Sequence, residues 1–154
     1  MDNLNHYIKE ITSVANRTGY LYEKWAKRQG INNYVSQIMY MIYTNETNRQ
    51  KDIAENYGMP KQTVNTIITE FQKKGYIRLI PDESDKRSKI IVLTDEGIKY
   101  AENIVKPLLN CEKEVLSKMG KERVEMLIDT MNQYAELFEQ SMNKFTQKEN
   151  MRRD

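Results

Sequence analysis

The sequence has almost none of the side chains that catalytic and metal centres need. Its 154 residues include one cysteine, Cys111, and one histidine, His6. A single cysteine cannot form an intrachain disulfide, and no Cys/His group has the spacing of zinc ligands. His6 has no partner constellation, and neither a nucleophile motif nor a phosphate loop occurs. We therefore expect no enzyme, no cofactor and no bound metal.

Long apolar runs are also missing. None approaches the roughly 18 residues that span a bilayer, and the N-terminus lacks a basic-then-apolar signal. This favours a cytoplasmic protein in a reducing compartment, with no membrane partner. Charge is nearly balanced, because 24 Lys and Arg stand against 22 Asp and Glu, a net charge of +2. So small a sum does not indicate a nucleic-acid partner, and the position of the positive charge matters more.

What the sequence does contain is a run of features over residues 48–97. A short helical pattern stops at Gly58, and an amphipathic helical pattern over 60–75 follows it. Two apolar strand-like runs, 76–80 and 89–93, then flank a polar tip. Helix, tight turn, helix and charged hairpin predict a winged helix-turn-helix in a mainly α (α+β) fold. Such a unit places one helix in a DNA major groove with a basic hairpin beside it.

The second helix of this motif is amphipathic. Its apolar face is expected to dock on the preceding helix and is formed by Val64, Ile67, Ile68 and Phe71. Its other face carries amides, hydroxyls and lysine, which pair with base edges or phosphates. The candidates for major-groove contact are Lys61, Gln62, Thr63, Asn65 and Thr66. The alternative is an ordinary solvated helix face.

The hairpin tip is the second basic feature. The candidates for DNA contact on this wing are Asp85, Lys86, Arg87 and Lys89. A guanidinium on a protruding loop can enter a narrow minor groove, where the negative potential is strongest. Asp85 can hold Arg87 in one orientation through a salt bridge. The alternative is a solvated turn that is basic only because turns are polar.

Long amphipathic helices are predicted at both ends of the chain. The first ends near Gly30, and the last follows Gly120. The short central helices cannot cover both apolar stripes, so we expect a homodimer that buries them between two copies. The alternative is that they pack on each other within one subunit. The predicted organisation is a helical dimerisation region of 1–32 and 107–146, a winged helix-turn-helix domain of 33–106, and a disordered tail of 147–154.

Local signals set several helix boundaries. Asn32 or Asn33 is expected to cap the second helix. Thr94 is expected to cap the helix after the hairpin, and Pro107 to kink that helix.

Residues 50–104 resemble the MarR family of winged-helix regulators, named for multiple antibiotic resistance. The matching residues are Gln50-Lys51-Asp52-Ile53-Ala54, Gly58, Lys61-x-Thr63-Val64, Lys73-Lys74-Gly75, Asp85-x-Arg87 and Leu93-Thr94-x-x-Gly97. The resemblance implies an obligate dimer on double-stranded DNA, a pseudo-palindromic operator and usually repression. It also implies release from DNA by a small molecule or an oxidised cysteine, and it makes Arg87 the minor-groove contact.

Three positions depart from the family pattern. Pro60 stands where a capping Ser is frequent, so the cap hydrogen bond is lost. Arg49 stands where a capping Thr is frequent, so Asn48 is expected to cap instead. Leu79 and Ile80 replace residues that are often basic, which makes the base of the wing more apolar.

The effector is less clearly indicated. Aromatic side chains proposed for a pocket that takes an aromatic or lipophilic effector are Tyr7, Tyr22, Trp25 and Tyr40; the alternative is ordinary packing. Cys111 can be a redox sensor or, more simply, a small apolar packing residue. The alternative to a DNA regulator is a winged helix that contacts another protein and has no specific operator.

Overall fold

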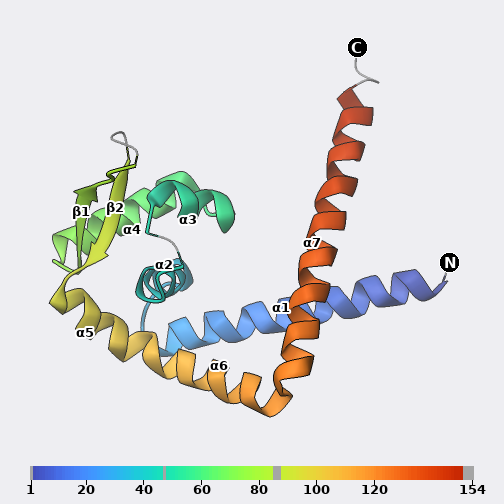
Figure 1. Cartoon of the computed structure of the whole chain (residues 1–154), viewed down its shortest axis with the longest axis horizontal. Coiled ribbons are helices and arrows are strands. Elements are labelled where there is room, and N and C mark those ends of the chain that lie inside the picture. The colour runs from blue at the N-terminus through green and yellow to red at the C-terminus, as the bar shows by residue number, and fades with distance from the viewer. Residues whose placement is uncertain (1, 47, 85–87, 151–154) are drawn as a thin grey trace. The chain divides into compact units, whose positions relative to one another are not determined.

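The computed structural model describes residues 2–46, 48–84 and 88–150 (Figure 1). Two compact units emerge, residues 1–109 and 110–154. The elements in order are α1 (Asp2–Arg28), α2 (Asn33–Tyr43), α3 (Gln50–Asn56), α4 (Lys61–Lys73), β1 (Ile77–Pro81), β2 (Lys89–Leu93), α5 (Asp95–Ile104), α6 (Lys106–Met119) and α7 (Lys121–Asn150).

The predicted mainly helical fold with a winged helix-turn-helix is confirmed. In the described ranges, no helix is long and apolar enough to cross a membrane.

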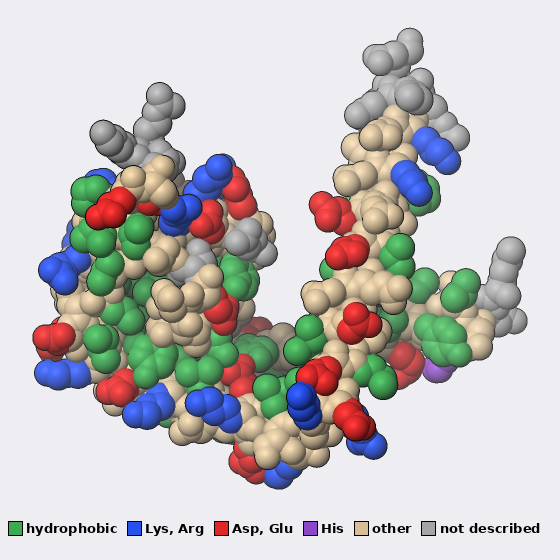
Figure 2. All heavy atoms as spheres, in the orientation of Figure 1, with side chains coloured by type: hydrophobic (Ala, Val, Ile, Leu, Met, Phe, Trp, Pro, Cys, Tyr) green, Lys and Arg blue, Asp and Glu red, His purple; other side chains and the backbone are tan. Residues whose placement is uncertain are grey.

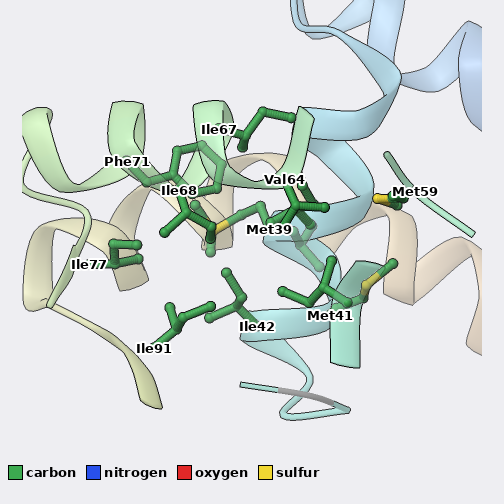
Figure 3. Close-up of a cluster of buried hydrophobic side chains, with 14 of the residues drawn as sticks. Met39, Met41, Ile42, Met59, Val64, Ile67, Ile68, Phe71, Ile77 and Ile91 are labelled. Carbon is green, nitrogen blue, oxygen red and sulfur yellow. The ribbon is translucent and has the colours of Figure 1, made fainter. Parts of the chain in front are cut away.

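The core of the first unit lies where α2, α4 and the two strands meet. Ile68 of α4 and Met39 of α2 are fully buried and lie against each other, with Ile42 and Ile91 beside them (Figure 3). Burying each such side chain stabilises the fold by about 1.5–3 kcal/mol. The apolar face predicted for α4 is therefore the face that docks this helix on the core.

The helix-turn-helix turn needs a glycine. Gly58 has a φ of 60°, a left-handed conformation that costs other residues energy. The Met59 N–H then donates to the Ala54 carbonyl at 3.1 Å, which closes α3. The chain can therefore reverse within a few residues and begin α4.

The two strands form an antiparallel pair, in register from Ile77 opposite Leu93 to Pro81 opposite Lys89. Thr94 links this wing to α5, because its Oγ1 accepts from the Gly97 N–H at 3.0 Å and donates to the Gly75 carbonyl at 2.5 Å. The predicted Thr94 cap is confirmed.

Of the other predicted caps, one is confirmed and one is wrong. Asn32 caps α2, with its side chain accepting from the Tyr34 N–H at 2.8 Å. The prediction that Asn48 caps α3 is wrong: Arg49 occupies the cap position, without a side-chain cap bond. The Asn48 carbonyl instead accepts from the Ile91 N–H at 2.7 Å, so this segment is held by β2.

The C-terminal helices are longer and more divided than expected. The helix after Thr94 does not continue through Pro107 as one kinked helix; it ends at Ile104, and α6 begins at Lys106. Proline has no N–H to donate to the preceding turn, which favours a break there. The α7 helix runs through Asn150, and the disordered tail expected for residues 147–154 stays a prediction. Residues 151–154 lie outside the described residues.

The N-terminal helix is joined to the winged helix inside the first unit. The Trp25 indole N–H donates to the Ile104 carbonyl at 3.1 Å, and Ala26 is buried nearby in sequence. The grouping of residues 1–32 with 107–146 as one dimerisation region stays a prediction.

Candidate nucleic-acid interface

The polar face of α4 is presented to solvent, because the opposite face is used in the core. Lys61, Gln62, Asn65 and Thr66 are exposed, and Thr63 is half-buried. The Thr66 hydroxyl donates to the Gln62 carbonyl at 2.8 Å, so it remains only an acceptor for an incoming group. The structure thus brings the five predicted major-groove residues together on the first two turns of one helix.

The positive charge of Lys61 at the start of α4 has an acidic neighbour that the sequence of the helix does not indicate. Lys61 lies 3.7 Å from a carboxylate oxygen of Glu55, which α3 supplies across the turn. Both side chains are well exposed, so the pair is weak in water and a phosphate can replace Glu55. Only the fold brings this acidic neighbour to α4.

A groove of about 570 Å³ separates α4 from the wing. It is lined by Gln50, Lys51, Asn65, Thr69, Gln72, Leu79, Ser88 and Lys89. Two of these side chains are cations, five carry amides or hydroxyls, and none is acidic. Such a lining suits a phosphodiester, which needs positive charge and hydrogen-bond donors.

Five groove residues were missed from the sequence: Gln50, Lys51, Gln72, Leu79 and Ser88. The first two begin α3, Gln72 lies in the second half of α4, and Leu79 and Ser88 belong to the hairpin. Thr69 lies on the polar face of α4 that the sequence did indicate. Gln50 and Lys51 fall in the motif that carried the family resemblance, and that was the available signal. Their approach to Lys89 depends on how the hairpin folds back over α4.

The structure describes the wing on both sides of its tip. Lys89 is exposed at the start of β2. Asp85, Lys86 and Arg87, the other predicted wing contacts, lie outside the described residues.

An ionic cluster lies at the end of β1, where the loop of the wing begins. Asp82 is 3% exposed, and its Oδ1 accepts from the backbone N–H and the hydroxyl of Ser84, at 2.8 and 2.7 Å. Its Oδ2 forms an ion pair with the Arg49 guanidinium. The Ser84 hydrogen bonds, followed by the Arg49 charge, hold the pKa of Asp82 below its ordinary value. The carboxylate is therefore charged at neutral pH.

Comparison with known proteins points to one family. Residues 36–89, from α2 to the start of β2, match the family model for the MarR family. The MarR family regulator NMB1585 from Neisseria meningitidis is 25% identical and superposes with a TM-score of 0.76, over 94% of this chain and 99% of that one. The winged helix-turn-helix part of the chain is therefore similar to the MarR family.

Two further proteins are similar to this chain. The HTH-type transcriptional regulator YwoH of Bacillus subtilis is 32% identical over 91 residues, 58% of this chain and 66% of YwoH. The MepR–DNA complex of S. aureus is 20% identical with a TM-score of 0.61, over 86% of this chain and 97% of that one, which shows a shared fold. The chain spans about one to two thirds of the length of the curated relatives it matches. Those relatives are named as transcriptional regulators, not enzymes.

The aromatic residues proposed for an effector pocket do not line the groove beside the wing or the second hollow described below. Tyr7 and Tyr22 are exposed on α1, Trp25 bonds to Ile104, and Tyr40 packs on the core. A second hollow of about 360 Å³ is lined by Glu23, Lys27, Gly30, Ile31, Asn32 and Asn33. The effector assignment stays a prediction.

Cys111 is exposed on α6. The simple interpretation of this thiol as a buried packing residue is therefore wrong within one chain. The described residues contain no group of three or more His, Cys, Asp or Glu side chains placed to hold a metal ion.

Proposed function

We propose that this chain is a homodimeric, sequence-specific DNA-binding repressor of the MarR type, located in the cytoplasm, that a small-molecule effector releases from a pseudo-palindromic operator. The observation that carries the DNA-binding part is the exposed polar face of α4, continued by a cationic groove toward the wing. In this proposal Gln62 and Asn65 read base edges, while Lys51 and Lys89 hold the phosphate strand in the groove.

Dimerisation is proposed because the terminal helices leave apolar faces exposed. Hydrophobic side chains run along α7 in Figure 2. Exposed large apolar residues are Leu4, Tyr7, Ile8, Ile11, Val14, Tyr20 and Leu21 on α1, and Met126, Leu127, Ile128, Met131, Tyr134, Leu137, Phe138, Met142 and Phe145 on α7. Faces this long are costly in water, and a second copy can cover both. Two copies would present paired α4 helices to successive half-sites.

Selection from random DNA with the purified full chain tests this function. We expect a twofold site whose half-sites lie about 10 base pairs apart. Asn65→Ala is expected to cost about 1–3 kcal/mol and to relax preference at one base step. Lys51→Ala is expected to weaken binding on all sequences and to reduce the salt slope by about one.

Lys99→Ala is the matched control, since Lys99 is exposed on α5 and outside the groove. Recovery of no preferred sequence would contradict the proposal. It would favour the second candidate, a protein-binding winged helix, for which the exposed Ile80 on the wing is the supporting observation.

A further inference from the structure

The ionic cluster at the end of β1 is the strongest feature of the first unit that the proposed function does not explain. Asp82 is almost completely buried, although carboxylates are rarely buried without a partner. Ser84 satisfies its Oδ1 with two hydrogen bonds. In the described part of the chain, Oδ2 makes no hydrogen bond and has only the Arg49 guanidinium beside it. Arg49 Nη2 also donates to the Ser84 hydroxyl at 2.9 Å, so the three side chains form a closed set.

Arg49 is well placed to tie two distant segments together. It lies immediately before α3, and its bond to Ser84 joins residues 35 positions apart. Next to it, the Asn48 carbonyl accepts from the Ile91 N–H on β2. The segment before α3 therefore holds the end of β1 through a side chain and β2 through its backbone.

The wing needs such an anchor. A two-stranded sheet is only marginally stable by itself. The Asp82 N–H donates to the Ser88 carbonyl at 3.2 Å, so Asp82 and Ser88 close the loop that carries the tip. Anchoring Asp82 consequently anchors the closing pair of the loop and, with it, Ser88 and Lys89 of the groove.

From this arrangement we infer that Arg49 is a positioning residue: by holding Asp82 and Ser84, it sets the wing against the helix-turn-helix before DNA arrives, and it makes no phosphate contact of its own. The inference rests on the proposed DNA-binding function. An anchored wing loses less conformational freedom on binding, which strengthens the complex without adding a contact.

Asp82→Asn separates this role from simple charge effects. Removing a negative charge beside a DNA-binding groove would tighten binding if only net charge mattered. The positioning role predicts the reverse: binding about tenfold weaker, because the wing is then ordered only on binding. The control Glu102→Gln removes a carboxylate from an exposed ion pair with Lys106, 3.2 Å apart on α5 and α6, and is expected to leave the affinity unchanged.

Arg49→Ala tests whether the guanidinium touches DNA. A lost phosphate contact would reduce the slope of log affinity against log salt by about one. We expect the affinity to fall as in Asp82→Asn while the slope is unchanged, and the double variant to bind no more weakly than either single variant. A reduced slope, additive losses, or tighter binding by Asp82→Asn would overturn the inference.

Amide hydrogen exchange in the free protein supplies a readout that needs no operator. Faster exchange at the Ile91 and Asp82 amides is expected in Arg49→Ala and, more weakly, in Ser84→Ala, with core amides such as Ile68 unchanged. Ser84→Ala is the mild variant if the others fold poorly. If the wild type finds no preferred DNA, the function fails, whereas unchanged exchange in all variants means that the anchor itself is wrong.

Discussion

Gly97 shows how one residue can be required by a neighbour's backbone. A Cβ at this position would lie 1.9 Å from the Tyr76 carbonyl oxygen, because α5 begins directly against the end of α4 and the start of the wing. The same carbonyl accepts from the Thr94 N–H at 3.0 Å, so it cannot easily move away.

The Gly97→Ala variant is therefore expected to lose about 2–3 kcal/mol of unfolding free energy, measured by urea denaturation, since overpacking forces the backbone to shift. Gly19→Ala is the matched control, because no heavy atom lies within 4 Å of a Cβ added to Gly19 in α1. It is expected to be neutral or slightly stabilising. Equal losses in both variants would mean that the contact with Tyr76 is unimportant.

Tyr57 makes the stability of the folded state change with pH in the alkaline range. Its hydroxyl donates to Glu46 Oε2 at 2.7 Å, and this hydrogen bond, with burial and the Glu46 charge, raises the pKa of Tyr57 to about 12 from 10.0. Because the folded pKa is the higher one, the stabilisation is present below pH 10 and is lost as the pH rises through 12.

The stability gap between wild type and Tyr57→Phe should therefore narrow between pH 10 and 12, as followed by thermal unfolding. In a Glu46→Gln background the narrowing is expected to be smaller and to end at lower pH, because the folded pKa of Tyr57 then lies closer to 10.0. A gap that stays constant across this range would refute the assigned hydrogen bond.

At the scale of an element, α4 is a helix whose start lacks a side-chain cap. Pro60 occupies the cap position with a φ of −56° and a ψ of 127°, and it makes no side-chain cap hydrogen bond. By contrast, α5 is capped by Thr94. The α4 helix, which we propose reads DNA, is therefore held mainly by Val64, Ile67, Ile68 and Phe71 in the core.

Pro60→Ser is expected to stabilise the fold by about 1 kcal/mol, because serine supplies the missing acceptor in an extended conformation that it readily adopts. Urea denaturation measures the gain. Pro60→Ala is the control: it replaces the same proline without supplying an acceptor, and an equal gain in both variants would point to loss of proline and not to capping.

At the scale of the whole molecule, the decisive interaction is the proposed association of two chains. Phe138 is 56% exposed on α7, within the apolar stripe, and Gln140 lies on a different face of the same helix. Phe138→Asp is expected to shift the dimer toward single chains in sedimentation and to weaken operator binding, while Gln140→Asp leaves both unchanged. A Phe138→Asp protein that still sediments as a dimer would rule out this face as the interface.

Much of the candidate site could be predicted from local pattern. The apolar spacing of Val64, Ile67, Ile68 and Phe71 places the opposite residues of α4 in solvent, whatever the rest of the chain does. The boundary residues Gly58, Thr94 and Gly120 were also readable, because turn and cap geometry depends on a few neighbouring residues.

Contacts between segments that are distant in sequence could not be predicted in this way. The amphipathic periods and the turn at Gly58 by themselves determined a mainly helical winged helix, and the single cysteine excluded an intrachain disulfide. Only tertiary structure decided that Glu55 faces Lys61, that Arg49 pairs with Asp82, and that Lys51 and Lys89 share a groove. Local geometry follows from neighbours in sequence, so it can be predicted from a short pattern. An ion pair or a groove depends on how separate elements pack, and the pattern within one element does not indicate which distant residues will lie beside it.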